Sequence, residues 1–264
     1  MAFVVRFVVW IWKGNRIYTA EHVNHLYRQL SRVCPGRFSL AAITDDTGGF
    51  LPGIDVIRTP PAALELAGLA TPERPNFPSC YRRLWMFSKE AECLGERVML
   101  IDVDLVFTAD PTPLFAIHGD FIGWRPLRTW GSENRFGGGI YLLKTGTRTQ
   151  VWDSFNGQQS IDLAKLAGLR GSDQAWLSYC LASTEPSWPR NSGIYSVRDL
   201  TWAPPIQTGK RRRTIKHLSR PLTLPDDAII VQFNGPDKCW QPHTQQRHPW
   251  LKEIYGRADT RQGA

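Results

Sequence analysis

The order of strand and helix patterns in the first sixty residues is the strongest constraint on how this chain can fold. Val, Phe, Ile and Trp dominate residues 3–12, and apolar runs of the same kind return at residues 37–46 and 54–60. Between the first two runs, Thr19 can cap an amphipathic helix that stops at Pro35. Strands alternating with helices form parallel or mixed sheets with helices packed on their faces. The sequence therefore predicts an α/β fold.

The rest of the chain continues this alternation. Helical patterns follow at residues 80–95, 147–155 and 172–183, and strand patterns at residues 97–101, 119–126, 137–146 and 229–233. With 264 residues, of which 42% are hydrophobic, the chain can bury a substantial core. We expect a single domain over residues 1–264, with an irregular, basic segment at residues 186–227 and a C-terminal tail at residues 241–264.

Location can be predicted from segments that the sequence lacks. There is no uninterrupted apolar run of about 18 residues, and the apolar N-terminus has neither a preceding basic stretch nor a small-residue cleavage site. The five cysteines are spread without C-x-x-C spacing, as expected for reduced thiols. These features predict a cytoplasmic protein.

A buried strand that ends in two acids is the first sign of function. Asp102 and Asp104 directly follow the apolar run at residues 97–101, and Leu105 resumes the apolar pattern. In open α/β sheets, ligands bind beyond the carboxyl ends of the strands, and residues i and i+2 of an extended chain share a face. Mg²⁺ and Mn²⁺ prefer carboxylate oxygens and keep substrate phosphates as further ligands. The pair is therefore a candidate metal site, although a solvated turn can carry the same pattern.

Five segments along the chain occur in the order typical of one enzyme family. They are "CYRRLWMF" at residues 80–87, "LIDVDLVF" at 100–107, "FGGGIYLL" at 136–143, "GSDQAWL" at 171–177 and "VQFNGPDKCW" at 231–240. In this order they resemble the glycosyltransferases of family 8 and their relatives with the GT-A fold. The resemblance spans roughly residues 3–240. It implies a GT-A-like fold, in which one Rossmann-like domain holds a mixed sheet flanked by helices.

The resemblance also implies a reaction. Enzymes of this family transfer a sugar from a nucleotide diphosphate, mostly UDP, with retention of configuration and with Mn²⁺ or Mg²⁺ bridging the diphosphate. The acceptor would be a glycan, a lipid-linked molecule or a protein. Carried onto this chain, the metal ligands would be Asp104, Gln232 and Asp102, and Asp102 would either bind the metal or hold the donor ribose.

The same resemblance implies roles for five other positions. Arg83 would hold a phosphate or the sugar, and Lys238, after the turn at Gly235, would stabilise the leaving diphosphate. Asp173, with Gln174 beside it, would bind sugar hydroxyls. Apart from the resemblance, the place of Asp45 and Asp46 at another strand end suggests contact with the donor base or ribose. Each has a simpler alternative: a surface arginine or lysine, an acid at a helix N-terminus, or a turn residue.

Two positions depart from the family pattern. Gln232 stands where the family has a histidine that serves as the third metal ligand, and its neutral oxygen is a harder ligand than imidazole. Gly137 stands where the family has an asparagine, which leaves three consecutive glycines whose backbone can approach a ligand closely.

Charge adds candidate partners without selecting one. The formal net charge is +8, and residues 209–220 are dense in Lys and Arg without an acid. This segment could be a solvated loop, or it could draw the protein to the anionic inner face of a membrane or to a phosphorylated acceptor. Nucleic acid is disfavoured because no reader motif accompanies the basic run. Two alternatives to a glycosyltransferase stay open: a nucleotidyltransferase-like enzyme, and a basic nucleic-acid-binding protein on a decayed transferase fold.

Overall fold

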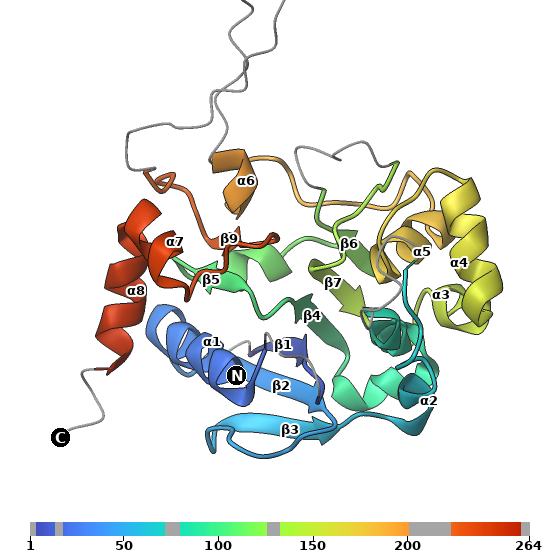
Figure 1. The fold of residues 1–264 in the computed structure, drawn as a ribbon, viewed down its shortest axis with the longest axis horizontal. Helices are drawn as coiled ribbons and strands as arrows, with labels where there is room; N and C mark the ends of the chain where they lie inside the picture. The colour runs from blue at the N-terminus through green and yellow to red at the C-terminus, as the bar shows by residue number, and fades with distance from the viewer. Residues whose placement is uncertain (1–3, 14–17, 72–79, 126–132, 201–222, 260–264) are drawn as a thin grey trace, which may run out of the picture.

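A six-stranded mixed sheet forms the centre of the molecule (Figure 1). The computed structural model describes residues 4–13, 18–71, 80–125, 133–200 and 223–259. In spatial order the strands are β3 (Ile54–Arg58), β2 (Phe38–Thr44), β1 (Val5–Trp10), β4 (Arg97–Ile101), β7 (Ile140–Lys144) and β6 (Phe121–Gly123). The first four are parallel, whereas β7 runs antiparallel to both of its neighbours. The predicted α/β fold with a mixed sheet is confirmed.

Both faces of this sheet are covered, because its strands alternate apolar side chains between two cores. On β1, Phe7 and Val9 join the core that includes α1 (Ala20–Val33), while Val8 and Trp10 join the opposite core. The opposite core lies under α2 (Pro61–Leu64), η1 (Cys80–Phe87), η2 (Lys89–Leu94), α3 (Gln150–Asp153), α4 (Gly157–Leu166) and α5 (Asp173–Cys180). A further 3₁₀ helix, η3 (Thr112–Phe115), packs with the α1 core. The parallel strands are therefore buried on both faces of the sheet, as their continuous apolar sequences predict.

A second, three-stranded sheet joins distant parts of the sequence. Its order is β5 (Leu105–Phe107), β9 (Ile230–Gln232) and β8 (Ile194–Ser196), with β5 antiparallel and β8 parallel to β9. In this register Leu105 lies opposite Gln232, and the Phe233 amide donates to the Asp104 carbonyl at 2.7 Å. The segment after β9 is therefore held against the pair of acids that follows β4.

The C-terminal residues form helices rather than a plain tail. After α6 (Val197–Leu200) and β9, the chain forms α7 (Pro242–Arg247) and α8 (Trp250–Asp259). Leu251 on α8 is fully buried in a third apolar cluster, and Figure 1 shows α8 beside α1. The basic run at residues 209–220 lies outside the described residues. Among the helices described, none has the length and apolar character needed to cross a membrane.

The segment at residues 80–95 is helical, but it does not form the single helix that the sequence predicts. The segment forms two 3₁₀ helices, η1 and η2, separated by the extended residue Ser88. Because all of Tyr81–Phe87 are buried, packing on several sides overrides the helical preference of the segment. A 3₁₀ helix has three residues per turn, so Arg82 and Arg83 project about 120° apart. The patterns also missed α4 and β8 and made α3 too long.

Candidate functional site

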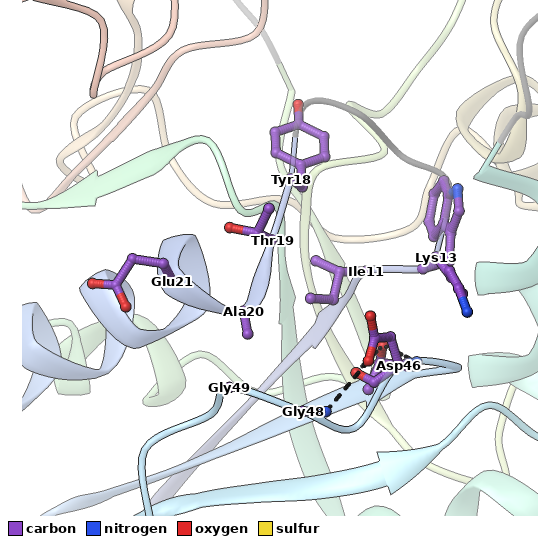
Figure 2. A pocket seen from close by; sticks show the side chains of 11 residues that line it. Ile11, Lys13, Tyr18, Thr19, Ala20, Glu21, Asp46, Gly48 and Gly49 are labelled. Carbon is purple, nitrogen blue, oxygen red and sulfur yellow. Dashed lines mark hydrogen bonds between the residues drawn. The ribbon is translucent and has the colours of Figure 1, made fainter.

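A cavity of about 420 Å³ opens where β1 and β2 end (Figure 2). Trp12 and Lys13 follow β1, Thr44 and Asp46 lie at the end of β2, and Tyr18 precedes α1. Figure 2 shows Gly48 and Gly49 on the loop beside Asp46, whose carboxylate accepts the Gly48 amide at 3.4 Å. Since the carboxyl ends of parallel strands form the ligand-binding edge of such sheets, the cavity has the expected position for a substrate.

Arg83 organises one half of the acidic site. Its guanidinium forms an ion pair with Asp102 through Nη1 and with Asp173 through Nη2, the latter at 2.7 Å. Asp173 is the first residue of α5, and Asp102 follows β4, so one side chain of η1 ties together three elements. We call Arg83, Asp102, Asp173 and Gln232 the Arg83 cluster. The alternative that Arg83 is a surface residue is wrong, because only 8% of its side chain is exposed.

Lys238 organises the other half. Its Nζ forms an ion pair with Asp104 Oδ2 and also donates to the Phe233 carbonyl at 3.3 Å. Tyr18 Oη donates to the same Asp104 oxygen at 3.0 Å. We call Lys238, Asp104 and Tyr18 the Lys238 cluster. Lys238 and Asp104 are 9% and 4% exposed, so the alternative of a solvated lysine is wrong as well.

The chain bends between the two acids. Val103 and Asp104 form a bend between β4 and β5, so the backbone is not extended there as the sequence pattern suggested. Asp102 and Asp104 consequently have separate partners, Arg83 for the first and Lys238 for the second. Burial is the main cause that raises the pKa of Asp104, and the two acids remain close enough for the charge of Asp102 to raise it further.

Gln232 reaches the first acid from the second sheet. Its Nε2 donates to Asp102 Oδ2 at 2.9 Å, and its Oε1 is buried without a hydrogen-bond partner. Gly139 makes room for this contact, because a Cβ at that position would lie 1.9 Å from Gln232 Nε2 and 2.2 Å from Asp102 Oδ2. The third glycine of the run 137–139 is thus required by a close approach of side chains.

Gln174 and Gly235 support neighbouring backbone. Gln174 Oε1 accepts the Gly138 amide at 3.3 Å, and its Nε2 donates to the Arg170 carbonyl at 3.3 Å. Gln174 thereby fixes the glycine run beside the Arg83 cluster. The Gly235 amide donates to the Phe233 carbonyl at 2.9 Å and forms the turn that leads to Lys238.

Asp45 belongs to a different group at the end of β2. It accepts the Lys13 amide at 2.5 Å, and Arg82 Nη1 lies 3.5 Å from its Oδ2. The guanidinium of Arg82 also lies 4.6 Å from the ring centre of Trp12. The neighbouring Asp46 lines the cavity, whereas Asp45 ties β1 to β2 and η1.

Burial and charge shape the ionisation of both clusters. Burial raises the pKa of Asp104 and of Asp173, and the cations Lys238 and Arg83 oppose that rise. Burial alone would lower the pKa of Arg83, but Asp173 and Asp102 raise it well above its usual value. Burial and Asp104 raise the pKa of Tyr18, which keeps its hydroxyl a neutral donor.

The fit of a divalent cation can be judged from the donor atoms. Within the described residues, no three His, Cys, Asp or Glu side chains form a group that could hold a metal ion. The chain offers two carboxylates, Asp102 and Asp104, and the buried, unpartnered Oε1 of Gln232. Such an all-oxygen set fits Mg²⁺ or Mn²⁺ if a substrate phosphate supplies further ligands. In this structure Oδ2 of Asp104 is paired with Lys238.

Sequence patterns missed Tyr18. Its hydroxyl contacts Asp104 across 86 positions of sequence, and its side chain lines the cavity. The available signal was its place between the first strand and the Thr19 cap, since that loop lies at the ligand edge of an α/β sheet. Sequence patterns also missed Arg82, because a helix predicted over this segment did not indicate which way the Arg82 side chain points.

Solved glycosyltransferases have a similar structure. The galactosyltransferase LgtC, in complex with donor and acceptor sugar analogues, matches with a TM-score of 0.64 at 15% identity, over 97% of this chain and 97% of LgtC. An active-site mutant of LgtC matches with a TM-score of 0.61 at 13% identity, over 96% of each chain. The apo form of GlyE from Streptococcus pneumoniae TIGR4 matches with a TM-score of 0.54 at 14% identity, over 97% of this chain and 64% of GlyE. No family model and no curated protein matches the sequence.

These matches establish the fold. They extend over nearly the whole of this chain and nearly the whole of LgtC. The GT-A-like glycosyltransferase fold predicted from the sequence is therefore confirmed, and it includes the strand edge that carries both clusters.

Proposed function

We propose that this protein is a glycosyltransferase that takes a sugar from a nucleoside diphosphate donor, with UDP as the favoured nucleotide. The acceptor is a glycan, a lipid-linked molecule or a protein. The transfer depends on Mg²⁺ or Mn²⁺ and retains the anomeric configuration. The proposal rests on the shared fold and on one feature of this chain, the convergence of the two ion-pair clusters around Asp102 and Asp104. Tyr18 connects them to the cavity at the ends of β1 and β2, because it lines that cavity and donates to Asp104.

That convergence is difficult to explain by stability alone. Asp173 and the partners Arg83, Gln232 and Lys238 come from segments far from the pair Asp102 and Asp104 in the sequence, and Asp104 and Asp173 are nearly fully buried. Removing charges from water is expensive, and apolar residues of similar size often serve stability as well or better. Buried acids with shifted pKa values beside a cavity are instead typical of functional sites.

The residues divide the work of such a reaction. The cavity side chains Trp12 and Tyr18 offer ring surfaces for the nucleoside, and Asp45 holds the two strand ends that form the cavity edge. Lys238, at the turn that begins with Gly235, donates to the departing diphosphate and stabilises its charge. The two partners of this step, an ammonium and a diphosphate, interact most strongly where water is excluded.

The Arg83 cluster acts on the sugar side. Arg83 fixes the carboxylates of Asp102 and Asp173, so that Asp173 accepts hydrogen bonds from sugar hydroxyls with Gln174 beside it. Holding the reacting groups in one orientation lowers the barrier without a covalent step. Retention then follows from attack by the acceptor on the face that the diphosphate leaves.

A divalent cation would be held by Asp102, Asp104 and the Oε1 of Gln232. When bound, it would neutralise charge that develops on the diphosphate. The chain's own part is to supply oxygen ligands and to keep Asp102 in place through Arg83 and the Gln232 amide.

Thermal unfolding with UDP, GDP and their sugars, each with and without Mn²⁺, tests the proposal. A ligand present at 100 times its Kd stabilises the folded state by about 2.7 kcal/mol. We expect stabilisation by a nucleoside diphosphate that increases when Mn²⁺ is present. Asp104→Asn should abolish the metal-dependent part, and transfer assayed with the stabilising sugar nucleotide should fall with it.

Asp226→Asn is the matched control, because Asp226 is an exposed acid on the segment before β9. It should leave binding and transfer unchanged. Stabilisation by nucleotides that is equal with and without Mn²⁺, and equal in wild type and Asp104→Asn, would exclude the metal-dependent transferase. Release of pyrophosphate from a nucleoside triphosphate would instead favour a nucleotidyltransferase.

A further inference from the structure

We propose that Lys238 is an internal cation that competes with the divalent metal for Asp104 and is drawn away by the donor diphosphate. Metal and donor therefore bind with strong mutual dependence, and the free protein has little affinity for the metal alone. This inference rests on the proposed function and adds to it how binding of the metal ion depends on Lys238 and on the donor diphosphate.

Asp104 has little room for a second cation while Lys238 is paired with it. The lysine ammonium and the Tyr18 hydroxyl both donate to Oδ2 of Asp104. The carboxylate is 4% exposed, so water cannot screen a cation brought beside the ammonium. A metal that binds to Asp104 must first displace Lys238 or accept its repulsion.

Lys238 can be displaced because of how it is held. Its Nζ contacts one carboxylate and one backbone carbonyl, that of Phe233, and lies 5.6 Å from the ring centre of Tyr18. It is carried by the loop after β9, outside any helix or strand. An ammonium on a flexible four-carbon stem can exchange one oxygen anion for another, whereas a guanidinium that spans two acids cannot do so without breaking both pairs.

Charge balance explains why a diphosphate is needed. The two clusters contain three acids, Asp102, Asp104 and Asp173, and two bases, Arg83 and Lys238, and so carry a net charge of −1. A divalent cation alone would reverse this to +1 in a largely buried site. A diphosphate supplies the missing anionic partner, both for the metal and for the lysine that the metal displaces.

The test measures metal binding directly. Titration calorimetry with Mn²⁺ is performed on wild type, Lys238→Met and Lys238→Gln, each with and without saturating UDP. In wild type we expect UDP to tighten Mn²⁺ binding by about 5- to 150-fold, the usual range of coupling between two sites. Without UDP, both variants should bind Mn²⁺ at least about tenfold more tightly than wild type, and UDP should add less.

Two further variants separate the effect of removing the Lys238 charge from any effect of substitution on folding. Lys238→Arg keeps the cation and should retain the weak Mn²⁺ binding of wild type without UDP. Lys252→Met removes an exposed lysine from α8 and should change nothing. Lys238→Gln can still donate a hydrogen bond to Asp104, so it keeps the test valid if Lys238→Met does not fold, as judged by circular dichroism.

The possible results distinguish this inference from the proposed function. If wild type binds UDP and Mn²⁺ together, but neither neutral variant binds Mn²⁺ alone more tightly, the competition by Lys238 is excluded while the transferase proposal survives. If no variant binds Mn²⁺ under any condition, both are overturned. Tighter Mn²⁺ binding in both neutral variants and not in Lys238→Arg supports the competition.

Discussion

The two clusters flank the same pair of acids but are built differently. Arg83 is held by two carboxylates, Asp102, which follows β4 of the main sheet, and Asp173, the first residue of α5. Lys238 is held by one carboxylate, Asp104, and lies on a loop of the second sheet. A planar cation that bridges two acids fixes architecture, whereas an ammonium with a single acid can be exchanged. The Arg83 cluster is therefore expected to carry stability and the Lys238 cluster to respond to ligands.

Arg83→Met should have the largest effect on stability. It leaves the buried carboxylate of Asp173 and the half-buried carboxylate of Asp102 without their cation, and breaking a buried ion pair in this way costs about 3–5 kcal/mol. Urea denaturation followed by circular dichroism measures the change. Lys238→Met strands one carboxylate, which still accepts from Tyr18, and should lose less.

The comparison has its own control in Arg247→Met. Arg247 pairs with Asp237 on the surface, where the arginine side chain is 57% exposed, and such pairs contribute about 0–1 kcal/mol. If Arg83→Met were no more destabilising than Lys238→Met, the distinction between a fixed and an exchangeable cluster would be wrong.

Sequence patterns were sufficient for the parts of this site that depend on local order. The structure confirms that Asp102 directly follows a buried apolar strand, and in α/β folds the end of such a strand is where ligands bind. That Asp102, Arg83 and Asp173 belong to one site was predicted from the family resemblance, and no pattern in the residues themselves predicted it.

The remaining features depend on long-range packing that a single sequence does not encode locally. Gln232 meets Asp102 across 130 positions because β9 pairs with β5, and β5 is only three residues long. The 3₁₀ geometry that separates Arg82 from Arg83 is imposed by burial on all sides of η1. Lys238 could be identified as a charged residue after a turn, but its pairing with Asp104 requires the second sheet.

Gly139→Ala tests the Arg83 cluster at the contact between Gln232 and Asp102. The added methyl group would collide with Gln232 Nε2 and Asp102 Oδ2, so one of them must move. Overpacking of this kind costs about 1–3 kcal/mol. Because Asp102 would be displaced, binding of Mn²⁺ in the presence of UDP should weaken as well, as calorimetry would report.

Gly68→Ala is the matched substitution, since a Cβ at Gly68 meets nothing within 4 Å. It should leave both stability and Mn²⁺ binding unchanged. Full stability in Gly139→Ala would mean that Gln232 and Asp102 have more freedom than their close approach indicates.

Tyr18→Phe should have the smallest effect and addresses the Lys238 cluster. It removes one hydrogen bond to Asp104, at 3.0 Å, and leaves the ring that lines the cavity. The loss should be about 1 kcal/mol in urea denaturation. In the Lys238→Met background, Tyr18 is the remaining donor that contacts Asp104 Oδ2 through a side chain, so the same substitution should cost more there. Equal losses of stability in the two backgrounds would show that the Tyr18 hydroxyl and the Lys238 ammonium act independently on Asp104. The Lys238 cluster would then consist of two separate contacts and would not respond to a ligand as one unit.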